Sequence, residues 1–168
     1  MLIPTRRRTW GPQGQTPIVR YLYKHDRLST IVALSVSAVR KRMGIYLCFQ
    51  EENFKAVNVA AFLRHVLEHL RGPILLLWDS GRAHQGPAIR VVLEAHPRLH
   101  VEPFPKYAPE LNPAEQVWND FKGRTANSLY DNTKQVGQRI RASKRRVSRS
   151  QEKLRSFVLS SELSSPPW

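Results

Sequence analysis

The sequence lacks several features that would assign it to a broad class of protein. It has one cysteine, Cys48, which excludes an internal disulfide, and no cysteine or histidine is spaced to join it in a zinc site. The longest apolar runs, such as PILLLW, are too short to cross a bilayer, and no signal-peptide core follows the basic start. Internal repeats and low-complexity tracts are also missing. We therefore expect a soluble, cytoplasmic protein with no membrane partner, in which Cys48 is a small buried strand residue.

Acidic residues are scarce. The 168 residues include 13 Asp and Glu against 27 Lys and Arg, a net charge of +14. The basic residues cluster at positions 6–8 and 137–155, and the second cluster holds eight of them beside a single acid, Glu152. An ordinary basic surface would also carry a positive charge, but clustering of this kind favours a polyanionic partner such as DNA. In a bacterium such a protein would be associated with the nucleoid.

Apolar patterning predicts strands early in the chain and helices later. Residues 16–23 and 29–37 are β-branched and apolar around a polar turn, so they predict a hairpin, and residues 44–50 predict a third strand. Residues 58–70 have apolar side chains at helical spacing, with Asn58 as the expected N-cap.

The second half of the chain alternates strands and helices. PILLLWD, residues 73–79, predicts a strand buried on both faces at the centre of a sheet. A helix is expected in residues 86–96, a short strand in residues 99–105 and a helix after Asn112 and Pro113. The basic residues beyond position 130 have looser helical spacing. This order predicts an α/β fold with a mixed sheet flanked by helices.

Two isolated acids lie where predicted elements end or begin. Asp79 follows the ILLLW strand, and the carboxyl ends of such strands collect ligands in open α/β sheets. Its alternative roles are to cap the next helix or to pair with Arg82. Glu115 falls in the first turn of a helix that starts at Asn112 and Pro113, where the helix dipole alone would favour an acid. Together the two carboxylates suit a hard divalent cation such as magnesium.

The residues around these acids resemble a known family. WDSGRAH, residues 78–84, is similar to the strand-end motif of DDE-type transposases related to mariner and to a large group of bacterial insertion sequences. FPKYAPELNPAEQVWNDFK, residues 104–122, is similar to their third-acid block, which leads to the catalytic glutamate. The interval between Asp79 and Glu115 is close to this group's spacing. TRRRTWGPQGQTP, residues 5–17, resembles the stretch that follows their first acidic motif, so the resemblance covers residues 5–122.

The resemblance implies a ribonuclease-H-like fold that holds two Mg²⁺ or Mn²⁺ ions between three carboxylates and cuts and transfers DNA strands at the ends of a mobile element. Asp79 and Glu115 would bind the metals. His84 would contact the acids or the DNA, or would be an ordinary helix-start residue. Trp78, Trp118 and Phe121 are expected to be packing residues. The candidates for binding DNA are Arg82, Lys106, Lys122, Arg145 and Arg146.

The sequence departs from the family at its first acid. The family's first catalytic aspartate lies ahead of the stretch that resembles residues 5–17, and Met1 already follows that point. Four acids precede Asp79, and they fall in a predicted turn, loop or helix: Asp26, Glu51, Glu52 and Glu68. We therefore expect residues 1–130 to be a truncated DDE core without its first strand and first acidic motif, and residues 131–168 to be a basic helical segment.

Two functions remain open on the sequence. The first is a DDE endonuclease that is active when an upstream polypeptide supplies the first aspartate. The alternative is a non-catalytic basic DNA-binding remnant. A missing first strand would also expose a sheet edge, which leads us to expect reduced stability or self-association. A homodimer is a candidate assembly.

Overall fold

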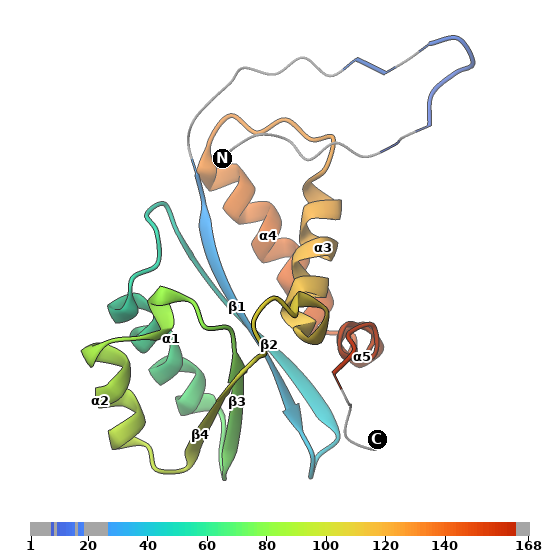
Figure 1. Cartoon of the computed structure of the whole chain (residues 1–168). Helices are drawn as coiled ribbons and strands as arrows, with labels where there is room; N and C mark the ends of the chain where they lie inside the picture. Colours follow the sequence, from blue (N-terminus) through green and yellow to red (C-terminus); the bar gives the residue numbers. More distant parts are fainter. Residues whose placement is uncertain (1–7, 9, 16, 19–26, 164–168) are drawn as a thin grey trace.

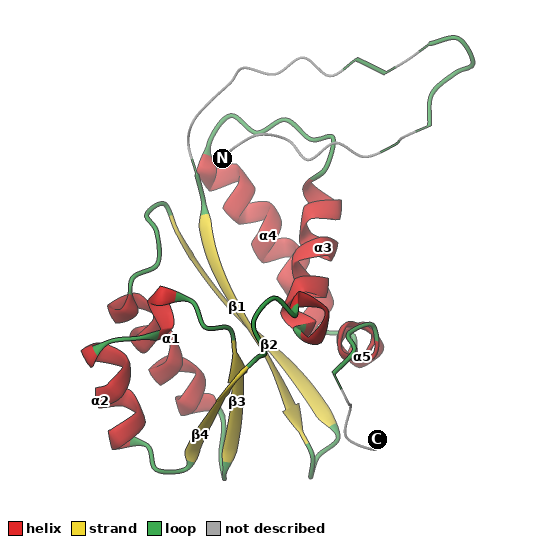
Figure 2. Cartoon of the chain, in the orientation of Figure 1, coloured by secondary structure: helices red, strands yellow, loops and turns green. Residues whose placement is uncertain are grey.

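The computed structural model describes residues 8, 10–15, 17–18 and 27–163, which form a mixed α/β fold (Figures 1 and 2). Two short 3₁₀ helices, η1 and η2, lie between the main elements. No helix in this described part is long and apolar enough to span a membrane. The elements in chain order are β1 Ser29–Ser37, β2 Arg42–Gln50, α1 Ala56–His69, β3 Ile74–Trp78, η1 Arg82–His84, α2 Pro87–Ala95, β4 Leu99–Pro103, η2 Pro109–Leu111, α3 Pro113–Thr125, α4 Thr133–Ser148 and α5 Gln151–Leu159.

The β1–β2 hairpin is antiparallel over its whole length, from the Ser29 and Gln50 pair to the Ser37 and Arg42 pair. The predicted pairing of residues 16–23 with residues 29–37 falls on residues that lie largely outside the described part of the chain, whereas residues 44–50, predicted as a third strand, lie within β2. Only residues 17 and 18 of the first predicted strand are described, and they are not in a strand. The short turn at residues 38–41 lets β2 fold back directly beside β1, as strands that follow one another in a chain commonly do.

A second, parallel pair of strands consists of β3 and β4, with Ile74 opposite Leu99 and Trp78 opposite Pro103. One face packs on α1 and α2 around Val59, Leu63 and Val92. Leu75 on the other face is 63% exposed, and β3 pairs with β4 alone among the described residues. The prediction of a central strand buried on both faces was therefore wrong for β3, which is covered by helices on one face.

Helix α1 begins earlier than the sequence indicated. Its N-cap residue is Lys55, and Asn58 lies in the first turn. The Asn58 side chain still stabilises the helix start, because its Oδ1 accepts a hydrogen bond of 2.9 Å from the Lys55 backbone N–H. Asn58 thus satisfies a backbone donor from inside the helix, as the third residue of a capping box does.

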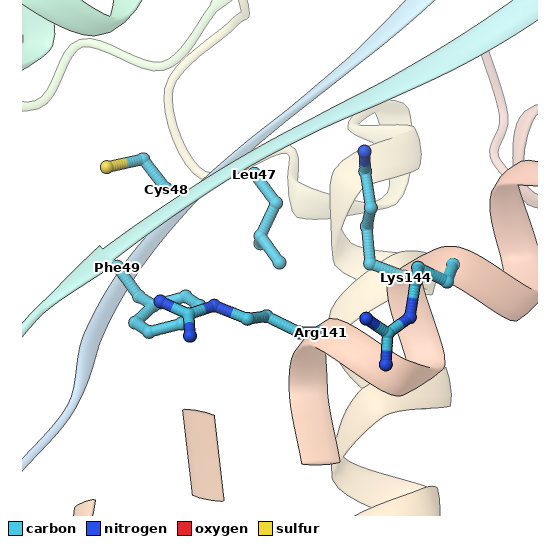
Figure 3. Close-up of a pocket in the computed structure, with 6 residues that line it drawn as sticks. Leu47, Cys48, Phe49, Arg141 and Lys144 are labelled. Atoms are coloured by element: carbon cyan, nitrogen blue, oxygen red, sulfur yellow. The ribbon is translucent and has the colours of Figure 1, made fainter. Parts of the chain in front are cut away.

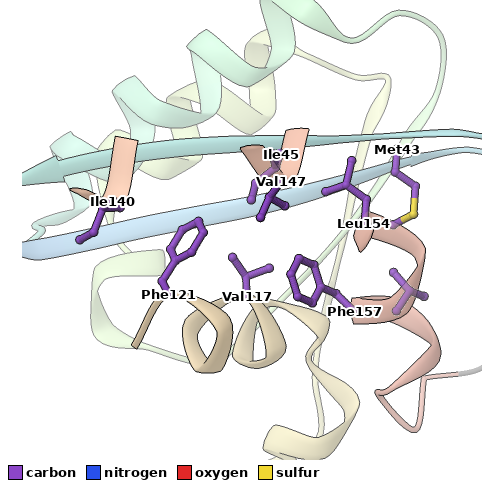
Figure 4. Packing of buried hydrophobic residues seen from close by; sticks show 9 residues of the cluster. Met43, Ile45, Val117, Phe121, Ile140, Val147, Leu154 and Phe157 are labelled. Carbon is purple, nitrogen blue, oxygen red and sulfur yellow. The ribbon is translucent and has the colours of Figure 1, made fainter. Parts of the chain in front are cut away.

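The β1–β2 hairpin lies between α1 and α2 on one side and α3, α4 and α5 on the other (Figure 1). Two apolar cores pack against it. Ile31 faces the core under α1, whereas its neighbour Val32 packs on the other side against α3, α4 and α5. Successive strand side chains point to opposite faces, so one hairpin can serve both cores. Figure 4 shows the second core, which consists of Met43, Ile45, Val117, Phe121, Ile140, Val147, Leu154, Phe157 and Val158.

The C-terminal helices are joined closely to this hairpin. Gln151 in α5 accepts a hydrogen bond of 2.8 Å from the Met43 backbone N–H and donates one of 3.1 Å to the Met43 carbonyl. Gly137 in α4 lies so near Phe49 that a Cβ atom there would approach the ring to 2.9 Å. The basic segment beyond residue 130 is therefore two helices that complete the second core.

An ion-pair network joins α3 to α5 beside this core. Arg124 donates to both oxygens of Asp120, and Lys153 Nζ lies 3.1 Å from Asp120 Oδ1. Burial alone would raise the pKa of Asp120, but the hydrogen bonds and positive charges of Arg124 and Lys153 outweigh burial and lower that pKa.

We expect Asp120→Asn to lower the free energy of unfolding at pH 7 by about 1 to 3 kcal/mol, because it removes the negative charge and one of the two acceptor oxygens that Arg124 and Lys153 contact. The lowered pKa means that the network stabilises the fold above about pH 4 and loses this effect as the pH falls through the folded-state pKa. Urea unfolding across this pH range measures both effects. Glu94→Gln, at an exposed position on α2, is the control. An unchanged acid dependence in Asp120→Asn would contradict this role.

Candidate active site and nucleic-acid interface

Asp79 is the first residue after β3, and its carboxylate has a defined orientation. Oδ1 accepts a hydrogen bond of 2.8 Å from the Gly81 backbone N–H and lies 3.0 Å from His84 Nδ1. The side chain of Asp79 is nevertheless 66% exposed. Asp79 thus contacts His84 and the backbone of a tight turn. It does not cap the next α-helix, because the N-cap of α2 is Gly86. The carboxylate is held on one oxygen and open to solvent.

His84 in η1 is positioned by three contacts. Its Nδ1 lies 2.9 Å from the Asp79 carbonyl oxygen as well as 3.0 Å from Oδ1, and both are acceptors, so Nδ1 carries the proton. Its ring stacks on Trp78 with 4.7 Å between centroids and an interplanar angle of 2°. Trp78 also packs into the core under α1, as predicted. The tryptophan therefore fixes the imidazole plane, and the imidazole in turn orients Asp79.

Glu115 lies in the first turn of α3, as the sequence predicted. Asn112 is the N-cap, its Oδ1 accepts a hydrogen bond of 3.0 Å from the Ala114 N–H, and Pro113 is the first helical residue. The 3₁₀ turn before this helix is held by the segment after α5, because Glu162 N–H donates to the Glu110 carbonyl oxygen. The start of α3, and with it Glu115, is thereby fixed in the fold.

The two acids belong to chain segments that follow β3 and β4, and these parallel strands end on the same side of the pair. Because β3 and β4 are parallel, the chain continues to Asp79 from β3 and towards Glu115 from β4 at their shared carboxyl ends. The Phe104 N–H donates a hydrogen bond of 2.8 Å to the Trp78 carbonyl oxygen, which keeps the carboxyl ends of β3 and β4 side by side.

The donor chemistry of these acids fits a hard cation. In the described part of the chain, neither Asp79 Oδ2 nor the Glu115 carboxylate has a hydrogen-bond or ion-pair partner. Both side chains keep solvent access, Asp79 as an exposed residue and Glu115 as a half-buried one. Carboxylate oxygens that are accessible and unpaired are the ligands that Mg²⁺ and Mn²⁺ select.

A basic pocket lies between β2 and α4 (Figure 3). Its lining includes Arg141, Lys144 and Arg145 from the helix, and the guanidinium of Arg141 lies 4.5 Å above the centroid of the Phe49 ring. Three cations beside an aromatic ring form a surface suited to a nucleic-acid backbone with its bases.

The other candidate DNA-binding residues are spread over several elements. Arg146 is exposed in the last turn of α4, outside the residues that line the pocket. Three more are exposed in η1, in the loop after β4 and in α3, respectively Arg82, Lys106 and Lys122. The structure thus brings Arg145 into a cluster of cations with Arg141 and Lys144, and the other candidates do not line this pocket.

Three features of the site were not predicted. The prediction that Cys48 is buried was wrong, because its side chain is exposed. Figure 3 shows this side chain on the opposite side of β2 from Phe49. Arg141 and Lys144 were not singled out, although Arg141 lies three residues before Lys144 and four before Arg145, spacings that place side chains on the same side of a helix. Tyr107, next to Lys106, is 98% exposed with a φ of 61°, a backbone conformation that non-glycine residues rarely adopt.

A comparison with protein families matches residues 1–137 to the model described as DDE superfamily endonuclease. The chain belongs to this family. No protein with a curated description matches it in sequence.

Solved structures similar to this DDE domain come from the Mos1 mariner transposase. The paired-end complex with Mn has a TM-score of 0.66 at 17% identity, covering 93% of this chain and 47% of that one. The strand transfer complex has a TM-score of 0.61 at 16% identity, covering 94% and 46%. The isolated catalytic domain has a TM-score of 0.53 at 15% identity, covering 82% and 83%. The chain therefore has the ribonuclease-H-like fold and spans about half the length of the full transposase chains.

We expect Gly81→Ala to weaken Mn²⁺ binding by about tenfold, the size of effect typical when a ligand loses its orientation. The backbone of Gly81, with φ of −58° and ψ of 145°, accepts alanine, but the new Cβ would lie 2.7 Å from Asp79 Oδ1. The carboxylate must therefore move. Electron paramagnetic resonance of free Mn²⁺ measures the affinity, with Ser80→Ala as the control. Equal Mn²⁺ affinity in Gly81→Ala and the unmodified chain would contradict a metal site at Asp79.

Proposed function

We propose that this chain is the catalytic part of a transposase, which cuts and transfers DNA strands at the ends of a mobile element with the help of Mg²⁺ or Mn²⁺. The observation that carries the proposal is the arrangement of Asp79, which is oriented yet open to solvent at the carboxyl end of β3. The chain leads from the parallel strand β4 to Glu115, which lies in the first turn of α3. Family membership supports the nuclease chemistry.

Asp79 and Glu115 are the proposed metal ligands. When bound, a pair of divalent ions would activate water or a 3′-hydroxyl and stabilise the leaving oxygen at a phosphodiester. The role of His84 is to hold Asp79 in position through Nδ1, which makes it a positioning residue. Arg82, exposed in η1 just after Asp79, and Lys106, exposed in the loop that precedes η2 and α3, would neutralise phosphates near the reacting bond.

Two acids do not complete the set of three that the resemblance implies. We propose that an upstream polypeptide supplies the third carboxylate, so that full activity requires both parts. The solved relatives support metal and DNA as partners: they include the Mos1 catalytic domain with Mg, and complexes named for paired transposon ends. A homodimer is the simplest assembly that would hold two such ends together.

A non-catalytic DNA-binding role is the second candidate. The observation in its favour is the pocket formed by Phe49, Arg141, Lys144 and Arg145, because this surface needs neither metal nor a third acid. A net charge of +14 would support DNA binding whether or not the chain cuts its substrate. The two roles differ in whether the function of the chain requires the carboxylates of Asp79 and Glu115.

A nicking assay separates them. The purified chain, with and without a polypeptide that carries the upstream acid, is incubated with Mn²⁺ and DNA bearing element ends. We expect nicking that Asp79→Ala and Glu115→Ala each reduce by at least about a hundredfold, because each removes a metal ligand. Glu110→Gln changes an exposed acid in η2, just before α3, and is the matched control. This variant should keep the nicking activity. Nicking absent under every condition, with DNA binding intact, would favour the second role.

DNA affinity should depend on the basic pocket. We expect Arg145→Ala to lower the slope of log affinity against log salt concentration by about one unit, the effect of losing one phosphate contact. Arg90→Ala, an exposed cation on α2, is the control and should leave the slope unchanged. Fluorescence anisotropy at several salt concentrations gives both slopes. Identical slopes for Arg145→Ala and the unmodified chain would remove the pocket from the DNA interface.

A further inference from the structure

A cluster of potential metal ligands lies on α1, an element that carries none of the proposed catalytic residues. His65, Glu68 and His69 are exposed, and each offers one donor atom within 4.8 Å of the others. Residues three and four positions apart share one face of a helix, so the backbone of α1 holds these side chains together. The three form a ligand set in the last turns of the helix.

The ring of His69 is arranged as in a metal-binding histidine. Its Nδ1 lies 2.7 Å from the His65 carbonyl oxygen, an acceptor, so Nδ1 carries the proton and Nε2 keeps a lone pair. A backbone carbonyl behind the imidazole is the common partner that orients a histidine ligand. Tyr46 of β2 contacts the same ring edge-on, with 5.9 Å between centroids. The fold therefore restricts this side chain although it is exposed.

The spacing of the donor atoms suits a small ion after minor rotation. In a tetrahedral zinc site with bonds of about 2.0 to 2.1 Å, neighbouring donors are about 3.3 Å apart. His65 Nδ1 and Glu68 Oε2 are already 3.8 Å apart, and the two imidazole rings have centroids 4.6 Å apart. Exposed side chains can close the remaining gap through their own torsions, without movement of the helix.

We propose that His65, Glu68 and His69 form a binding site for a transition-metal ion such as Zn²⁺ or Ni²⁺. Two imidazoles and one carboxylate favour these ions over Mg²⁺, which prefers oxygen ligands alone. Water completes the coordination. The site thus differs in ligand chemistry from the one proposed at Asp79 and Glu115, and it depends on α1 alone.

Ion binding would stabilise the fold. Val66 and Leu67 lie between His65 and Glu68 in the sequence and are buried, at 8% and 5% exposed. Packing of these two residues against the core holds α1 in place, so the three ligands come together only when the chain is folded. An ion that binds the folded chain and not the unfolded one raises stability by mass action. The neutral alternative is a solvated helix face on which His65 and Glu68 form a weak pair.

Calorimetric titration of the chain without a polyhistidine tag tests the proposal. We expect one Zn²⁺ or Ni²⁺ ion per chain, no saturation by Mg²⁺ with this stoichiometry in the same concentration range, and a rise in melting temperature with Zn²⁺. His65→Ala and His69→Ala should each weaken binding by about tenfold or more, because each removes one imidazole ligand. Glu68→Gln should weaken it by less, because the amide oxygen of glutamine can still coordinate the ion. His100→Ala, an exposed histidine on β4, is the matched control and should bind like the unmodified chain.

Two results would overturn the site. The first is the absence of saturable zinc binding in the unmodified chain. The second is one-to-one binding that survives in the His65→Ala and His69→Ala double variant, with circular dichroism confirming an intact fold. The titration contains no DNA, so its outcome is independent of the nicking assay.

Discussion

The two-sided packing of the β1–β2 hairpin is the constraint on which the rest of the structure depends. Ile31 on one face and Val32 on the other enter separate cores, so the hairpin joins α1 and α2 to α3, α4 and α5. Side-chain alternation makes this possible, and a shift of one residue in register would exchange the two faces. Hydrogen bonds between the Gln151 side chain and the backbone of Met43 hold the C-terminal helices to the same hairpin.

The candidate active site combines local turn chemistry with strand pairing. Asp79 is oriented by residues that follow it closely, Gly81 and His84, and the plane of His84 is held by Trp78. Glu115 is placed by a helix cap and by the parallel pairing of β3 with β4. Because each acid is held by structure that does not include the other, we expect substitution of one to leave the other in position.

The chain also separates its charges by chemistry. The carboxylates suited to Mg²⁺ lie at strand and helix ends, the cations suited to phosphate gather on α4, and the imidazoles suited to Zn²⁺ share one face of α1. Hard oxygen ligands and imidazoles prefer different ions. The nicking, salt-dependence and zinc-titration experiments therefore address three surfaces that can be altered one at a time.

Sequence alone determined the features that depend on neighbouring residues: the cap at Asn112, the first-turn position of Glu115, the helical face of α1 and the motifs that resemble DDE transposases. Tertiary structure decided the rest. The exposure of Cys48 and the one-sided burial of β3 depend on which segments pack together, and residue patterns do not encode this directly. The same holds for the meeting of Phe49 with Arg141, since contacts between residues far apart in the chain form only when the fold brings their elements together.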